Sequence, residues 1–180
     1  GESLPDFMKA FLASHSPVLA TASLLEPEYD LMRQIEVFGL VRRRYPRAGL
    51  MIIGSGSLEQ ILKETAARTS YAADILLCGD VPHDQALLAI KASDVFLRTT
   101  IYDGDSISVR EALHFGTPVI ATDAGIRPDG THLVPPRDSE ALNRAIEDIL
   151  SRPEAPRKMN GSGEDNLRAV LALYGELISE

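Results

Sequence analysis

Apolar positions along most of the chain follow two alternating patterns. Between residues 29 and 45 they recur every three or four positions, which is the period of an amphipathic helix. The run at residues 50–53 is apolar at every position and too short for a helix, so it predicts a buried strand. We expect strands at 17–23, 50–53, 74–79, 94–99, 117–122 and 131–134, and helices at 29–45, 58–68, 84–92, 106–115 and after Asp138.

This alternation predicts the fold class. Strands that are apolar on both faces and separated by amphipathic helices indicate a parallel sheet covered on both sides. We therefore expect an α/β fold, a doubly wound, Rossmann-like sheet of about six strands. Such sheets bind ligands outside the carboxyl ends of their strands, which draws attention to the loops at 23–29, 54–57, 79–83, 99–106 and 122–130.

The ends of the chain depart from the pattern. We expect one domain over residues 17–150. Residues 1–16 read as a linker or the tail of a missing N-terminal domain, within which residues 6–14 are either helix or tail. Residues 151–166 are rich in Pro, Gly, Ser and charge and predict a loop, followed by a C-terminal helix at 167–180.

Composition narrows the functional classes. The 180 residues have a formal net charge of −8, which argues against non-specific nucleic-acid binding. The one cysteine, Cys78, lies in an apolar run, so we expect a buried core residue and a cytoplasmic protein. No apolar run approaches the ~18 residues that span a membrane. Peripheral membrane association stays open.

The stretch at residues 103–123 carries the most chemistry. It crosses from the end of a strand through a loop into a helix, which Asp105 or Ser106 could cap. The first N–H groups of that helix should face the ligand crevice and suit a phosphate. Asp103, just before the helix, could accept hydrogen bonds from hydroxyl groups, and Glu111 could reach a second polyol such as a ribose.

The same stretch resembles a known signature. Glu111-Ala112 and Gly116-Thr-Pro118-Val119 are similar to the motif of the retaining GT-B glycosyltransferases of family 4, also called glycosyltransferase group 1. That motif has two glutamates separated by seven residues, and Asp103 takes the place of the first. Further matches lie at residues 52–56, 78–81, 92–97 and 133–138.

The resemblance implies a function and a set of site residues. The chain would be the C-terminal, donor-binding half of a two-domain enzyme that transfers a sugar from a nucleotide-sugar with retention and without an essential metal. The missing N-terminal domain would bring a saccharide or lipid-linked acceptor, so we expect the isolated chain to bind donor weakly and turn nothing over. The implied roles are catalytic for Asp103 and Glu111, diphosphate-binding for Ser106, Ile107 and Ser108, and nucleotide-binding for Gly54, Gly56, Val81 and Glu111.

One departure from the family pattern concerns charge. The family places Arg and Lys after the first strand to neutralise the diphosphate, where this chain has Ser23 and Glu28. Arg98 could supply the missing charge and bind the diphosphate, with Arg110 and Arg127 as weaker candidates. Alternatively, the donor lacks a nucleotide diphosphate, or the domain binds without catalysing. Residues 125–130 also differ from the family's usual Gly-Gly-x-x-Glu loop.

Other readings of the sequence remain. Asp103-Gly-Asp105 is also a short D-x-D metal motif, but it follows the fourth strand, out of its usual context. Gly54-Ser-Gly56 lacks the third glycine of a dinucleotide fingerprint. A non-catalytic sugar-nucleotide-binding module and an epimerase-like domain are the alternative functions. We expect no metal site, because the histidines lack ligand spacing.

Overall fold

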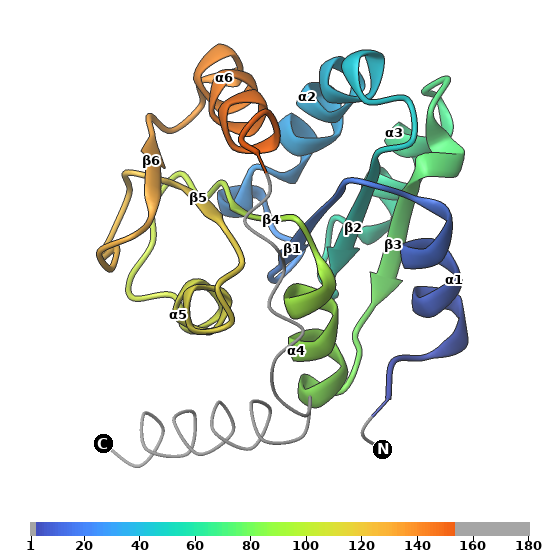
Figure 1. Ribbon diagram of the computed structural model, residues 1–180, viewed down its shortest axis with the longest axis horizontal. Coiled ribbons are helices and arrows are strands. Elements are labelled where there is room, and N and C mark those ends of the chain that lie inside the picture. The colour runs from blue at the N-terminus through green and yellow to red at the C-terminus, as the bar shows by residue number, and fades with distance from the viewer. Residues whose placement is uncertain (1–2, 154–180) are drawn as a thin grey trace.

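The computed structural model describes residues 3–153 as a six-stranded parallel sheet between two layers of helices (Figure 1). The predicted doubly wound α/β fold is confirmed, with every expected strand and helix in place up to residue 150. In chain order the elements are α1 (Asp6–Ser14), β1 (Val18–Ala22), η1 (Pro27–Tyr29), α2 (Leu31–Arg44), β2 (Gly49–Ile53), α3 (Glu59–Ala67), η2 (Ala72–Asp74), β3 (Ile75–Gly79), α4 (His83–Ala92), β4 (Val95–Arg98), α5 (Ile107–His114), β5 (Val119–Thr122), β6 (His132–Val134) and α6 (Ser139–Leu150).

Strand β1 shows how the sequence builds the two layers. Its residues point alternately to opposite faces of the sheet, and nearly all of them are buried. Leu19 joins the core beneath α2, α3 and α6, whereas Val18 and Ala20 join the core beneath α1 and α4. Helix α5 covers the same face as α4, over Phe96. Figure 1 shows the two helical layers on either side of the sheet.

The order of the strands creates a crevice. It runs β3-β2-β1-β4-β5-β6, so the chain first winds outward from β1 and then returns to place β4 on the other side of β1. The loops that follow β1 and β4 therefore leave the sheet toward opposite faces. The opening between them, at the carboxyl ends of the strands, is where this type of sheet binds its ligands.

Helix α1 belongs to the packed domain. Met8 is fully buried and Phe11 nearly so, and both contact the sheet in the cluster shared with α4. The packed unit therefore includes residues from Asp6 onward, instead of beginning at residue 17. The predicted loop at 151–166 and helix at 167–180 lie almost wholly outside the described residues, which end at 153.

Cys78 is partly buried, and this burial raises the pKa of its thiol to about 12, which fits an unreactive core residue. Over residues 3–153, no helix combines the length and apolar character needed to cross a bilayer.

Candidate functional site

Helix α5 begins at the carboxyl edge of the sheet, directly after the loop that follows β4. Ser106 is its N-cap, as expected, and its Oγ accepts a hydrogen bond from the Val109 N–H at 3.3 Å. Ser106 Oγ also lies 3.1 Å from Ser108 Oγ. The N–H groups of Ile107 and Ser108 lie in the first turn, where a helix offers them no carbonyl partner. This start presents unpaired donors and a partial positive charge.

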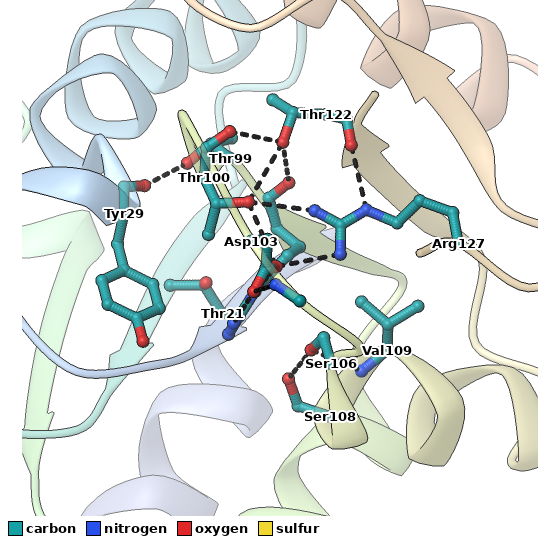
Figure 2. Close-up of polar contacts among 12 residues, drawn as sticks. Thr21, Tyr29, Thr99, Thr100, Asp103, Ser106, Ser108, Val109, Thr122 and Arg127 are labelled. Atoms are coloured by element: carbon teal, nitrogen blue, oxygen red, sulfur yellow. Dashed lines mark hydrogen bonds and ion pairs between the residues drawn. The ribbon is translucent and has the colours of Figure 1, made fainter. Parts of the chain in front are cut away.

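The Asp103 carboxylate, which the sequence predicts to accept hydrogen bonds from sugar hydroxyl groups, is bonded to neighbouring groups of the domain (Figure 2). Its Oδ1 accepts from Arg98 Nη2 at 3.2 Å and from the Gly104 N–H at 2.9 Å. Its Oδ2 accepts from Arg98 Nε at 3.0 Å, Thr100 Oγ1 at 3.2 Å and Arg127 Nη1 at 2.9 Å. A carboxylate has about four lone-pair sites, so a ligand hydroxyl group would compete with these five donors for Asp103.

Two arginines also set the charge of Asp103. Burial by itself would raise the pKa of this carboxyl, but hydrogen bonds from Arg98 and Arg127 hold the pKa below its ordinary value of 3.8. The side chain is 11% exposed, so water does little to screen these contacts. Asp103 is therefore ionised throughout the neutral range.

Arg98 faces inward, toward Asp103. Its side chain is 10% exposed, and its guanidinium stacks on the Tyr29 ring at 4.9 Å from the ring centroid. Both its Nε and its Nη2 donate to Asp103. The diphosphate contact expected of Arg98 therefore competes with an internal partner that already holds the guanidinium in a bidentate pair.

Arg127 connects the loop after β5 to the loop after β4, a role that the sequence did not predict. Its side chain is 3% exposed. Besides Asp103, it donates from Nε to the Thr122 carbonyl and from Nη2 to Thr100 Oγ1, both at 2.9 Å (Figure 2). Gly125 permits this contact, because a Cβ there would lie 2.7 Å from the Asp103 carbonyl oxygen. No local sequence pattern predicts these contacts, because Asp103 and Thr100 precede Arg127 by 24 and 27 residues along the chain.

The two carboxylates of the D-x-D motif are paired with arginine side chains. Asp105 accepts two hydrogen bonds from Arg110, at 2.7 and 2.8 Å, while Asp103 is held by Arg98 and Arg127. Both carboxylates are thus paired with guanidinium groups. Three guanidinium groups face two carboxylates, which leaves an excess of one positive charge around the start of α5.

Glu111 is a buried acid with an incomplete hydrogen-bond shell. Its side chain is 6% exposed, and His83 Nε2 lies 3.1 Å from its Oε1. The two groups are at ion-pair distance, yet Oε1 is buried without an aligned hydrogen-bond donor among the residues that the structure describes. Buried polar atoms are rarely left in this state, so the oxygen marks a place where a ligand could donate a hydrogen bond.

Gly54 and Gly56 have a structural explanation. A Cβ on Gly54 would lie 1.8 Å from the Ser23 carbonyl oxygen, and one on Gly56 would lie 2.5 Å from the Leu25 carbonyl oxygen. Gly54 also has φ +135°. The two glycines let the loop after β2 pack against the loop after β1. Val81, the other expected nucleotide contact, is partly buried and packs against the core beneath α1 and α4.

A family model described as Glycosyl transferases group 1 matches residues 6–165. The chain belongs to this family. It is 26% identical over 161 residues to the GDP-mannose-dependent alpha-(1-6)-phosphatidylinositol monomannoside mannosyltransferase of Mycolicibacterium smegmatis, a match covering 82% of this chain and 42% of that protein. It is 23% identical over 164 residues to the trehalose synthase of Pyrococcus horikoshii, covering 84% and 40%. The chain thus spans less than half the length of these relatives.

Solved structures share the fold. The C-terminal domain of the glycosyl transferase group 1 family protein LpcC from Francisella tularensis gives a TM-score of 0.71 at 17% identity, covering 93% of this chain and 94% of that one. Anabaena HepE in complex with UDP gives a TM-score of 0.70 at 16% identity, covering 98% and 52%. The glycosyl transferases group 1 assignment, with a GT-B type of domain, is therefore confirmed.

In this glycosyl transferases group 1 domain, the loop after β1 is held by other loops. Ser23 Oγ is buried without a hydrogen-bond partner within residues 3–153. The nearby Glu26 carboxylate accepts from both the N–H and the hydroxyl of Ser57, and these hydrogen bonds lower the pKa of Glu26. The Glu28 carbonyl accepts from the Ile101 N–H at 2.8 Å. The loop therefore carries the neutral Ser23 and the acidic Glu28 at the positions where the family resemblance led us to expect Arg and Lys.

Proposed function

We propose that this chain is the donor-binding domain of a glycosyltransferase that transfers a sugar from a nucleotide-sugar with retention of configuration. The observation that carries the proposal is the buried, incompletely bonded Glu111 on the helix that starts at the crevice of the sheet. Its Oε1 has His83 Nε2 at ion-pair distance but no aligned hydrogen-bond donor within residues 3–153, so it can accept a hydrogen bond from a ligand. We assign the ribose hydroxyl groups of the donor to Glu111, because ligands of doubly wound sheets bind at this crevice.

The start of α5 is our proposed diphosphate site. The N–H groups of Ile107 and Ser108, beside the capping Ser106, point out of the first turn, and helix starts favour anions. The surrounding arginines add an excess positive charge. Together they would stabilise the negative charge that grows on the leaving phosphate, so the reaction would need no essential metal.

Asp103 and Arg98 have a revised role in this proposal. Asp103 positions Arg98 and Arg127 and contacts no hydroxyl group of the donor. Arg98 would then add positive charge near the diphosphate site while it stays paired with Asp103. Val81 stays a predicted contact of the base, at the loop before α4.

We propose that the acceptor site and the rest of the active site lie in another domain of the whole protein. The relatives are more than twice as long as the matched region, so we propose that an N-terminal GT-B domain completes the cleft. One relative is named as acting on phosphatidylinositol monomannoside, and another is the alpha-monoglucosyldiacylglycerol synthase of Streptococcus pneumoniae. We propose a saccharide or lipid-linked acceptor for this chain, with cytoplasmic location and peripheral membrane contact.

A second candidate function is a sugar-nucleotide-binding module without turnover. The specific observation is that Ser23 and Glu28 replace the expected cations. A carboxylate near the diphosphate is repulsive, and a helix start contributes only ~0.3–1 kcal/mol against it.

Calorimetric titration with UDP-, GDP- and ADP-sugars tests the proposed function. We expect one nucleotide class to bind with a dissociation constant on the order of 1 mM or tighter. Glu111→Gln should weaken that binding about tenfold or more, because a charged hydrogen bond contributes ~1.5–3 kcal/mol. Glu59→Gln, which alters an exposed surface pair on α3, is the matched control and should leave binding unchanged. If none of the three classes binds, the proposal fails.

A further inference from the structure

His83 covers the oxygen of Glu111 that our proposed function assigns to the donor. His83 is the first residue of α4, and Glu111 lies on the neighbouring α5. Nε2 of His83 lies 3.1 Å from Oε1 of Glu111, and that oxygen has almost no contact with solvent. A ligand hydroxyl group that bonds to Oε1 must therefore occupy space near the imidazole.

The side chains of His83 and Glu111 differ in their exposure to solvent. His83 is 39% exposed, so its ring has solvent into which it can turn. Glu111 is 6% exposed and lies on α5, so its side chain is more closely enclosed than that of His83. If a donor binds to Glu111, we expect His83 to be the side chain that moves.

We propose that His83 is a positioning residue that holds Glu111 in the free domain and is displaced from it by the donor, so that donor binding releases a proton. This inference rests on the proposed function, because it takes Glu111 as the contact of the nucleotide ribose. It adds a proton-linked step to that contact. The expected consequence is donor affinity that depends on pH.

The electrostatics give the sign of the dependence. The contact of His83 with the Glu111 carboxylate, at hydrogen-bonding distance, raises the pKa of His83 above 6.5. Burial opposes this, and the negative charges of Glu111 and Asp84 raise the pKa further. Strand β1, which also packs on α4, carries no titratable side chain. Displacement from Glu111 lets the pKa of His83 fall back toward its ordinary value. Protonation therefore favours the free domain, and donor binding strengthens as pH rises through the raised pKa.

The experiment is calorimetric titration of the chain with UDP-glucose and with GDP-mannose at about pH 5.5 and about pH 8.5. The diphosphate of either donor stays ionised over this range, so it adds no titration of its own. We expect binding to be several-fold tighter at the higher pH, because the imidazole then no longer carries the charge that favours its contact with Glu111. Repeating the titration in buffers with different ionisation heats should show release of up to one proton.

Two variants separate His83 from other titrating groups. His83→Gln keeps an N–H donor near Glu111 but cannot titrate, so its affinity should be equal at both pH values. His114→Gln removes an exposed histidine of the same helix α5 and should keep the dependence of the parent chain. Circular dichroism and thermal unfolding check that both variants are folded.

Four outcomes would overturn the inference. Donor affinity that is independent of pH, or tighter at the lower pH, would contradict it while leaving the proposed function intact. The same holds if His83→Gln retains the dependence of the parent chain. Failure of both donors to bind at both pH values would overturn the proposed function and this inference together.

Discussion

At the scale of single residues, the crevice is organised by the pairing of Asp103 with Arg98 and Arg127. The carboxylate is saturated by five hydrogen bonds, three of them from the two guanidinium groups. All three side chains are nearly buried, so each depends on the others for compensation of its charge. An acid that matches a binding motif in the sequence thus serves here to hold two loops in place.

This pairing predicts a large effect on stability when one partner is removed. Arg127→Met should lower the free energy of unfolding by about 3–5 kcal/mol, because it leaves Asp103 with less compensation and breaks two further hydrogen bonds. Urea unfolding followed by circular dichroism measures the change.

Arg110→Met is the matched control. Arg110 makes a bidentate pair with Asp105, but both side chains are about 35–42% exposed, so the loss should be within ~1 kcal/mol. Similar losses in the two variants would show that the buried network is not what stabilises these loops.

At the scale of elements, helix α5 connects the fold to the proposed chemistry. Ser106 ends the loop and starts the helix, so the cap that stabilises α5 also orients the first N–H groups toward the crevice. Helix α6 is capped in the same way by Asp138, whose carboxylate accepts from the Ala141 N–H at 2.9 Å. The second cap belongs to a helix of the opposite layer and serves only stability.

The two caps predict a separation of stability from binding. Ser106→Ala and Asp138→Ala should each lower the free energy of unfolding by about 1 kcal/mol. Only Ser106→Ala should weaken donor binding, because only α5 starts at the proposed diphosphate site. Denaturant titration and calorimetry with UDP-glucose and GDP-mannose measure the two effects. Equal donor affinity in both variants would argue against a diphosphate site at α5.

At the scale of the whole molecule, the strand order decides where a ligand can bind. The order β3-β2-β1-β4-β5-β6 places the crevice between the loops after β1 and β4. The curated relatives are more than twice as long as the region that matches this chain. We therefore expect the acceptor to be brought by another domain.

If donor and acceptor are bound by different domains, this chain alone should bind donor without turnover. The purified chain should bind its donor yet release no nucleotide from UDP-glucose or GDP-mannose above the uncatalysed background, because no second domain closes the cleft and excludes water. Release of free nucleotide measured by chromatography tests this. The full-length mannosyltransferase of Mycolicibacterium smegmatis, assayed with GDP-mannose, is the positive control. Steady transfer or hydrolysis by the chain alone would contradict the prediction.

Local patterns explain why the elements could be predicted. Leu31, Ile35 and Phe38 recur at the helical period, and the run at residues 50–53 is buried on both faces, as its composition indicates. The Ser106 cap was also predictable, because capping acts within three residues. The segment at residues 6–14 remained ambiguous, since its helix depends on burying Met8 and Phe11 against distant strands.

The sequence by itself determined the parallel sheet, the helix at the crevice and the position of Glu111, because each follows from short-range periodicity, capping and motif spacing. Only the tertiary structure decided what the charged side chains do. Asp103 meets Arg127 and Glu111 meets His83 through loops and helices that are far apart along the chain. Such contacts depend on how whole elements pack, so the local preferences of neighbouring residues do not predict them.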